Sequence, residues 1–413
     1  MQVKKLKKIN FLAFSLLLMI ALSMVNSQVN SVSPIHFQEK TTANPTLQIY
    51  TYQSLMSDAY YNIAGNFTAY SGINVNITRF SDANELVTQL VSGGSKADLI
   101  IGIDNALINL INVPDYFVQY DNTSVLNNIN SNLINNLDPG HYLIPYDYGV
   151  IALTYQNQLV NSSNYPFLNN FTFNDLLNSN LASKIIVEDP QISSTGLGFL
   201  LSTIATYGDN NTNITGLLGK DWRPFWKQLN NKFTVTGSWN DALTSFLNPK
   251  AQLPVMVSYL TDPAYNYCRY NDTSTSSAIT TLSNGSKTGW FQVEGLGVVK
   301  NSPNQVAAKK FMDWFLSKDL QDQIPESQWM YPSNTQAIIP ACFSESGIPN
   351  PNTIIPLNNY LTTGNLKSYL NNWLDEWQQI RVTKNLPGFE IITLSFIFPN
   401  LAIIVILRKK NKE

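Results

Sequence analysis

The order of strand-like and helix-like segments near the start of the body constrains the fold of this chain more than any other feature. Strand-like runs occupy residues 47–52 (LQIYTY), 73–80 (INVNITRF) and 97–103 (ADLIIGI). Helix-like runs separate them at residues 57–70 and 83–91. Strands that alternate with helices in this way are typical of an α/β fold with parallel strands. We therefore expect an α/β protein.

The length of the body predicts two lobes. The chain has 413 residues, and the body between its two ends exceeds the size of one typical hydrophobic core. A strand-like run at 142–156 is apolar enough to form a buried crossing between the lobes. We expect lobe 1 to comprise residues 46–148 with 290–335, and lobe 2 to comprise residues 149–289 with 336–384.

Both ends of the chain carry signals of export. Four lysines within the first eight residues precede an uncharged run, so residues 1–27 are predicted to be a signal peptide or a signal anchor. Residues 28–45 are polar and without periodicity, which is typical of a linker. Residues 385–407 are predicted to be a transmembrane anchor helix, because their apolar run precedes a basic tail, 408–413, that should be cytoplasmic. The alternative for this run is a buried core helix. The body is then expected to be extracellular and held at the cell membrane.

Composition agrees with an exported globular protein and argues against a nucleic-acid partner. Charged residues make up 13% of the chain, and its net charge is -2. Nine N-glycosylation sequons are consistent with a glycoprotein. The two cysteines, Cys268 and Cys342, can pair in an oxidising compartment or stay free.

A turn rich in serine, threonine and glycine precedes an apolar helical run at 197–206. The turn contains Ser193, Ser194, Thr195 and Gly196. The first N–H groups of a helix lack partners within the helix and lie at the positive end of its dipole, so this turn can bind phosphate or carboxylate. The alternative is an ordinary N-cap that bonds only to its own backbone.

Aromatic residues and one acid follow the predicted strands. They are Tyr52, Asp82, Trp239, Tyr259 and Tyr265, and Trp329 lies in a later loop. Ligands of open α/β sheets bind at the C-terminal ends of strands, so these side chains can form an aromatic cleft for a flat or cationic ligand. Asp82 would bind an amino group or balance a positive ring. Each aromatic side chain taken singly can instead belong to the core.

Catalytic and metal-binding motifs are missing from the sequence of the body. His141 is its only histidine, no GxSxG motif occurs, and no His/Cys cluster has metal-ligand spacing. We therefore expect a binding protein rather than an enzyme, with no catalytic residue and no metal. An exported hydrolase that uses a carboxylate pair is the alternative.

Seven sequence strings occur within residues 47–340 in this order: YTYQS, SKADLIIGIDN, PYDYG, EDPQISSTGLGFLL, TVTGSW, VSYLTDPAY and WMYPSN. The thiamine-binding proteins of ABC importers carry matching strings in the same order, and the chain resembles that family. The resemblance implies a two-lobed periplasmic-binding-protein fold (type II) that closes on thiamine, thiamine monophosphate or thiamine diphosphate, with no further cofactor. The partners that it implies are an ABC permease and its ATPase.

The resemblance also implies a role for each matching residue. Ring contacts would come from Tyr52, Trp239, Tyr259 and Tyr265, a polar contact from Asp82, and phosphate contacts from Ser193, Ser194 and Gly196, with Trp329 near the ligand. Two departures leave the exact ligand open. Ala59, followed by Tyr60 and Tyr61, stands where bacterial members carry a tryptophan, and Thr195 stands where they carry a proline.

The main alternative within the same fold is a protein that binds iron, a polyamine or a sugar. Paired tyrosines with a histidine would indicate iron, and clustered carboxylates would indicate a polyamine. The tail, which lies outside the resemblance, begins with LPGFE at 386–390. This short sequence is similar to the Pro-Gly-Phe tails of some archaeal surface proteins, which fits a membrane-anchored archaeal protein.

Overall fold

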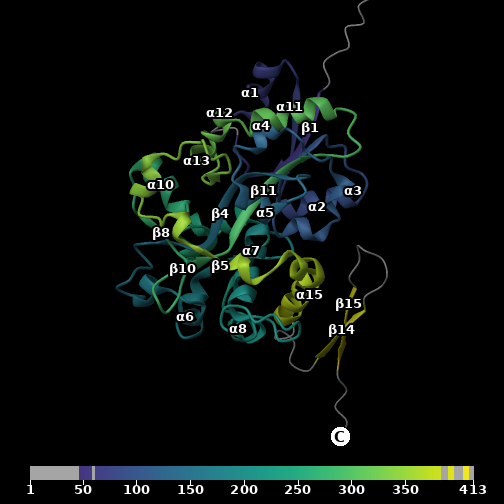
Figure 1. Ribbon diagram of the computed structural model, residues 1–413. Coiled ribbons are helices and arrows are strands. Elements are labelled where there is room, and N and C mark those ends of the chain that lie inside the picture. Colours follow the sequence, from purple (N-terminus) through teal and green to yellow (C-terminus); the bar gives the residue numbers. More distant parts are fainter. Residues whose placement is uncertain (1–45, 58–60, 383–388, 395–402, 409–413) are drawn as a thin grey trace, which may run out of the picture. The chain divides into compact units, whose positions relative to one another are not determined.

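The computed structural model (Figure 1) describes residues 46–57, 61–382, 389–394 and 403–408. The predicted signal peptide (1–27) and linker (28–45) lie outside the described residues, as do Ala59 and Tyr60. The described body begins at Thr46.

One large sheet runs through the body. Its main path has the order β2-β1-β3-β11-β4-β7-β5-β6, and β12 (Tyr331–Pro332) and β8 (Thr275–Ala278) pair with β4 off this path. The strands of the path are β1 (Leu47–Tyr52), β2 (Val75–Phe80), β3 (Leu99–Asp104), β4 (Ile144–Gln156), β5 (Ile185–Glu188), β6 (Thr234–Thr236), β7 (Val255–Tyr259) and β11 (Phe291–Val298). Strand β1 pairs in parallel with β2 and β3. Helices α1 (Ile63–Ser71) and α2 (Ala83–Val91) connect these three strands, so the α/β pattern predicted for residues 47–103 is confirmed.

Strand β4 joins two groups of strands. Its residues 144–150 pair antiparallel with β11, and its residues 151–155 pair antiparallel with β7. The strand predicted at 142–156 is therefore observed. We use lobe 1 for the group around β1, β2, β3 and β11, and lobe 2 for the group around β5, β6 and β7. The residue boundaries expected for the lobes stay a prediction.

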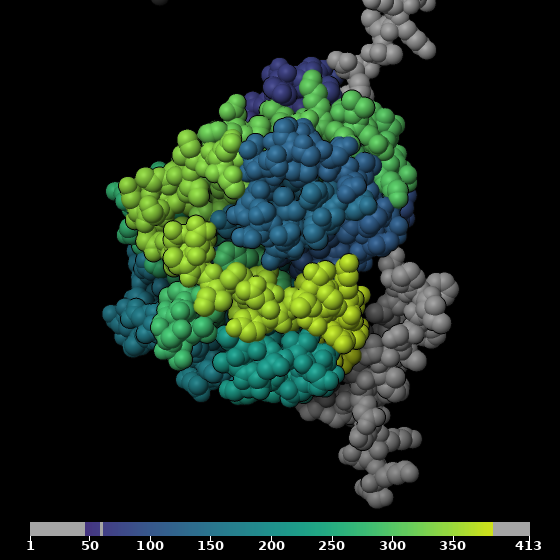
Figure 2. Space-filling model, viewed as in Figure 1, coloured from purple at the N-terminus to yellow at the C-terminus, as the bar shows by residue number. Residues whose placement is uncertain are grey.

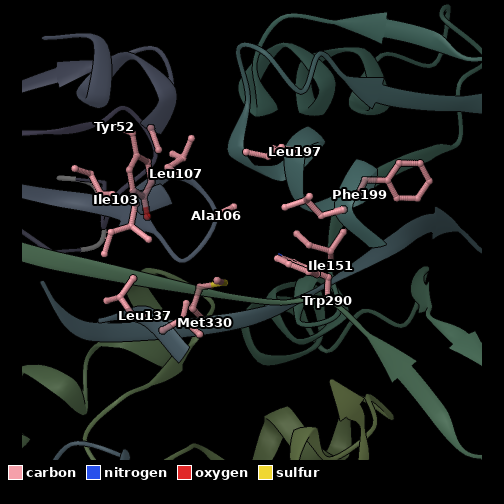
Figure 3. Packing of buried hydrophobic residues seen from close by; sticks show 14 of the residues in the cluster. Tyr52, Ile103, Ala106, Leu107, Leu137, Ile151, Leu197, Phe199, Trp290 and Met330 are labelled. Atoms are coloured by element: carbon pink, nitrogen blue, oxygen red, sulfur yellow. The ribbon is translucent and has the colours of Figure 1, made fainter. Parts of the chain in front are cut away.

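Apolar side chains from both lobes contribute to one large buried cluster, and smaller clusters lie beside it. Figure 3 shows Tyr52 and Ile103 grouped on one side of the view and Leu197, Phe199 and Ile151 on the other. Helix α7 (Ser194–Tyr207) is buried along its whole length. A helix that is covered on every side can be largely apolar all round, as this one is.

Helix α15 (Thr363–Val382) packs against both lobes. It contacts η1 (Leu107–Leu110) of lobe 1 and α8 (Arg223–Leu229) of lobe 2. Figure 2 shows this stretch, in yellow, between blue residues of lobe 1 and teal residues of lobe 2. Arg223 of α8 bonds to α15, since its Nε donates to Glu376 Oε2 at 2.7 Å. Its Nη1 also lies 2.7 Å from Asp209 Oδ1. The C-terminal helix thus covers the body across the two lobes.

The predicted anchor helix over 385–407 is wrong for the part of it that the structure describes. Strand β14 (Phe389–Leu394) pairs antiparallel with β15 (Ile403–Arg408). Both strands are rich in β-branched residues, which favour extended backbone, and Pro399 lies between them in the sequence. Among the helices in the described ranges, none is both long enough and apolar enough to cross a membrane.

The two cysteines form a disulfide. Cys268 belongs to α10 (Asp262–Tyr270) and Cys342 to α14 (Ala341–Glu345), and their sulfur atoms are 2.02 Å apart. The sequence left this pairing open. The bond ties α10, a helix of lobe 2, to α14, which follows β12 in the chain.

Candidate ligand-binding site

A cavity of about 490 Å³ lies between the lobes and is lined by residues of both. Pockets for small organic molecules have volumes of about 300 to 1,000 Å³, so this cavity is of a suitable size. Lobe 1 contributes side chains that follow β1 and β2, and lobe 2 contributes side chains from β7, α9 (Trp239–Leu247) and α10. The wall is completed by residues 327–330, which comprise the last residue of α13 (Ile324–Ser327) and the three that follow it.

Most of the residues predicted to bind a ligand line this cavity. They are Tyr52, Asp82, Ser194, Thr195, Trp239, Tyr259, Tyr265 and Trp329. Two predicted residues do not line it. Ser193 is fully buried, and Gly196 packs against the backbone of Glu188. The structure thus brings the predicted aromatic residues together at one cavity. Ser193 and Gly196 of the serine-rich turn do not line it.

Tyr52 belongs to a buried network around a carboxylate. Its hydroxyl donates to Glu294 Oε2 at 2.5 Å, and the Tyr146 hydroxyl donates to the same oxygen. Gln328 Nε2 donates to the Tyr52 hydroxyl at 2.7 Å. The Tyr52 ring lies against Gly102, where a Cβ would be 2.4 Å from two ring carbons, so only glycine leaves room for this ring. The network holds Glu294 at the cavity wall, and burial raises its pKa.

Asp82 joins the two lobes at the N-terminus of α7. It is the N-cap of α2, where its Oδ1 accepts from the Ala83 N–H at 2.7 Å. The same oxygen accepts from the Ser194 N–H at 3.1 Å. Burial raises the pKa of Asp82, although these N–H donors act in the opposite direction. A carboxylate from lobe 1 therefore meets the helix end where the sequence predicted an external anion.

Gly196 allows α7 to lie close to the end of β5. A Cβ at this position would be 2.3 Å from the Glu188 carbonyl oxygen, which is far inside van der Waals contact. The glycine of the predicted phosphate turn therefore has a packing role. It sets the position of Ser194 and Thr195, the next residues toward the cavity.

Replacing Gly196 by alanine is expected to lower the free energy of unfolding by about 1 to 2 kcal/mol, because α7 must move away from β5. Chemical denaturation measures this loss. Gly364→Ala is the matched control, since the nearest atom to its Cβ would be 3.6 Å away and Gly364 also lies in the first turn of a helix. Equal stabilities of the two variants would contradict the packing role.

Trp329 and Tyr265 form an aromatic corner of the cavity. Their rings meet edge to face, with centroids 5.0 Å apart. Trp329 stacks on Phe343 at 6.4 Å, and the Arg269 guanidinium lies over the tryptophan ring at 5.3 Å. The backbone of Trp329 has a φ of +61°, a left-handed conformation that is uncommon for a residue of this size. Such strained positions are often found at ligand sites, because the surrounding structure holds them in place.

Trp239 and Tyr259 are oriented by hydrogen bonds within lobe 2 and across to β11. Trp239 Nε1 donates to Ser258 Oγ at 2.9 Å. The Tyr259 hydroxyl accepts from Gln292 Nε2 at 2.9 Å and lies 3.4 Å from Thr195 Oγ1. Thr195, where the sequence departs from the family pattern, thus contacts a predicted ring residue.

The sequence reasoning missed two acids of the cavity, Asp262 and Glu294. Asp262 begins α10, and its Oδ2 accepts from Thr154 Oγ1 at 2.8 Å. Burial raises its pKa to about 6. Glu294 is the one charged residue of strand β11, and a lone charge in a buried strand is a signal that could have found it.

The charged side chains among the described residues of the cavity lining are Asp82, Asp262 and Glu294. That described lining contains no lysine, arginine or histidine. In the described part of the chain, no group of three or more His, Cys, Asp or Glu could hold a metal ion. Aromatic faces with nearby carboxylates suit a flat organic cation.

Comparisons with known proteins place this geometry in context. Residues 49–322 match the family described as bacterial extracellular solute-binding protein. A thiamine-binding periplasmic protein of Brucella suis is 28% identical over 341 residues, which are 80% of this chain and 92% of that protein. A thiamine-binding periplasmic protein of Escherichia coli is 27% identical over 347 residues, covering 82% and 94%.

Solved structures agree in fold. A periplasmic thiamin binding protein superposes with a TM-score of 0.66 at 25% identity, covering 83% of this chain and 98% of that one. A ferric binding protein from Campylobacter jejuni has a TM-score of 0.61 at 18% identity, covering 81% and 99%. The second likeness shows the fold alone, because proteins of one fold bind unrelated ligands.

Proposed function

Because the chain belongs to the family of bacterial extracellular solute-binding proteins, we propose that it captures thiamine, thiamine monophosphate or thiamine diphosphate outside the cytoplasm and delivers it to an ABC permease and its ATPase. The observation that carries this proposal is the cavity between the lobes, which aromatic side chains and three carboxylates line together. The thiamine-binding relatives and the thiamin-binding structural neighbour support the choice of ligand. The family is one of binding proteins rather than enzymes.

The proposed binding mode assigns a task to each wall of the cavity. Trp239, Tyr259, Tyr265 and Trp329 would cover the faces of the ligand rings, where cation–π contacts contribute about 0.5 to 2 kcal/mol each. Asp82 would accept from an amino group of the ligand. Because both lobes line the cavity, a bound ligand favours the closed arrangement, which a permease can distinguish from an open one.

A polyamine is the second candidate, since three carboxylates line the cavity. A polyamine has no flat ring, and the aromatic walls therefore favour thiamine over it. Calorimetric titration with thiamine and with spermidine separates the two candidates. We expect saturable binding of one thiamine per chain and weaker binding of spermidine. No binding of thiamine, or tighter binding of spermidine, would overturn the proposal.

Affinity for thiamine is expected to fall on acidification. In the free protein Asp262 has a pKa of about 6, raised by burial, and a bound cation would lower it. Binding then releases a proton, so the affinity should decrease about fourfold between roughly pH 7.5 and 5.5. Titrations at the two pH values measure the change. The Asp262→Asn variant should show a flatter dependence, and an affinity that rises on acidification would contradict this account.

We also propose that residues 1–27 are a signal peptide, which directs export and is then removed. The extracellular family supports this location, and the apolar sequence at 391–407 with its basic end supports attachment to a membrane, although strands replace the predicted helix in its described part. N-terminal sequencing of the mature protein and extraction of membranes with and without detergent test the two statements. An intact N-terminus would contradict cleavage, and release without detergent would contradict attachment.

A further inference from the structure

A buried glutamine on β11 lies between the two aromatic walls of the cavity. Gln292 is 1% exposed and is not among the lining residues. Strand β11 belongs to lobe 1 and pairs with β4, the strand that joins the lobes. Burying an amide costs free energy unless it is hydrogen-bonded, so the partners of this side chain indicate its role.

The Gln292 amide nitrogen faces three acceptors. Its Nε2 lies 2.9 Å from the Tyr259 hydroxyl, 3.2 Å from Glu294 Oε1 and 3.3 Å from Ser194 Oγ. The three acceptors share two hydrogens, and the shortest of the distances is the one to Tyr259. Tyr259 and Ser194 belong to lobe 2, whereas Glu294 lies two residues further along β11 in lobe 1. The side chain therefore bonds to both lobes.

The same amide links a tyrosine of each wall. The Tyr52 hydroxyl donates to Glu294 Oε2, and Gln292 bonds to the other oxygen of this carboxylate. From Gln292 the path continues to the Tyr259 hydroxyl. Tyr52 lines the cavity from lobe 1 and Tyr259 lines it from lobe 2. One buried path of hydrogen bonds thus joins the two tyrosines, and in this path Gln292 makes the step between the lobes.

The backbone leaves room for the Tyr259 ring to reach Gln292. Gly149 of β4 is the register partner of Gln292 on β11. A Cβ at Gly149 would be 2.8 Å from Tyr259 Cδ1 and 2.6 Å from Met330 Cε, which is closer than carbon atoms pack. The Tyr259 ring therefore lies over this glycine, with its hydroxyl at the Gln292 amide. Close packing and a hydrogen bond fix the ring together.

A ring that is fixed before a ligand arrives loses less side-chain freedom when the ligand binds. A mobile side chain that must be ordered on binding lowers the affinity, and a side chain ordered in advance avoids this loss. Hydrogen bonds from residues behind a site give the contacting groups this order. We propose that Gln292 is a positioning residue for ligand binding, which holds the Tyr259 ring at the cavity and joins it to Glu294 and Tyr52 of the opposite wall. The inference rests on the proposed function and deepens it, since Gln292 acts on the ligand through another side chain.

A double-mutant cycle in the full-length protein, measured by calorimetric titration with thiamine, tests the inference. Gln292→Met keeps the length of the side chain and removes its donors, so the Kd should rise about tenfold. Tyr259→Phe keeps the ring and removes the hydroxyl that Gln292 holds, so the Kd should rise about fivefold. In the Tyr259→Phe background, Gln292→Met should raise the Kd by no more than about a further threefold, because the bond is already absent.

Gln321→Met is the matched control. Gln321 is also fully buried with a hydrogen-bonded amide, but its partners Phe315, Ser333 and Asn334 do not line the cavity. This variant should lose stability in thermal unfolding and keep the wild-type Kd. A rise in Kd equal to that of Gln292→Met would show an effect of general destabilisation and overturn the inference.

Two further results would overturn the inference and leave the proposed function standing. One is a tenfold loss from Gln292→Met that persists in the Tyr259→Phe background, because the glutamine would then not act through Tyr259. The other is a wild-type Kd for Tyr259→Phe, and this single variant suffices should Gln292→Met not fold. No binding of thiamine to the wild-type protein would overturn the proposed function and, with it, this inference.

Discussion

Replacing Trp239 by alanine is expected to weaken thiamine binding by about 2 kcal/mol, which is roughly a thirtyfold rise in Kd. Trp239 begins α9 and lines the cavity, and its Nε1 bond to Ser258 Oγ at 2.9 Å orients the ring before a ligand arrives. The substitution removes apolar contact surface and one cation–π partner. Both losses act on the bound state more than on the free protein.

Calorimetric titration measures this loss, and Trp239→Phe provides a graded comparison. Phenylalanine keeps an aromatic face but cannot donate to Ser258, so its loss of affinity should lie between those of wild type and alanine. Thermal unfolding of both variants checks that the fold is retained. An alanine variant that binds thiamine with wild-type affinity would place Trp239 outside the site.

Removing the disulfide is expected to have the largest effect on stability. Cys268 and Cys342 are separated by 74 residues, and closing a loop of this length stabilises the folded state by about 4 kcal/mol in the chain-entropy account. The double variant Cys268→Ala/Cys342→Ala should therefore unfold at a markedly lower denaturant concentration. Its affinity for thiamine should also fall, because α10 carries Tyr265 as well as Cys268.

The single variants Cys268→Ala and Cys342→Ala distinguish the bond from the individual side chains. Either one alone breaks the disulfide, so each should lose about as much stability as the double variant. Wild-type protein unfolded in the presence of a reductant should show the same shift. A double variant with wild-type stability would show that the two helices are held together without the bond.

The periodicity of the sequence predicted the elements that carry the site. Strand β1, helix α2 and strand β4 lie close to their expected positions, because each has a clear pattern of apolar residues. Aromatic residues placed after these and later strands were expected to meet, and the structure brings them to one cavity. Local pattern and the order of α/β elements were sufficient for this part of the prediction.

Contacts between distant parts of the chain could not be predicted in the same way. The bond between the Ser194 N–H and Asp82 depends on how the two lobes meet, and no local pattern contains that information. Gly196 was interpreted as part of a phosphate turn, whereas its neighbour in space is the Glu188 carbonyl. Glu294 gains its place in the site from hydroxyls on β1 and β4.

The C-terminal segment was misjudged for a different reason. Hydropathy and a basic end both indicated a membrane helix, but neither property distinguishes a helix from a pair of apolar strands. The β-branched residues of β14 and β15 supplied that distinction, and Pro399 within the run pointed in the same direction.

A crystal structure of the protein grown with excess thiamine would show directly whether thiamine binds between the lobes. We expect one thiamine molecule in the cavity, with its rings against Trp239, Tyr265 or Trp329 and a carboxylate of the lining beside its positive or amino group. Thiamine bound elsewhere on the protein, or an empty cavity at saturating thiamine, would contradict the account.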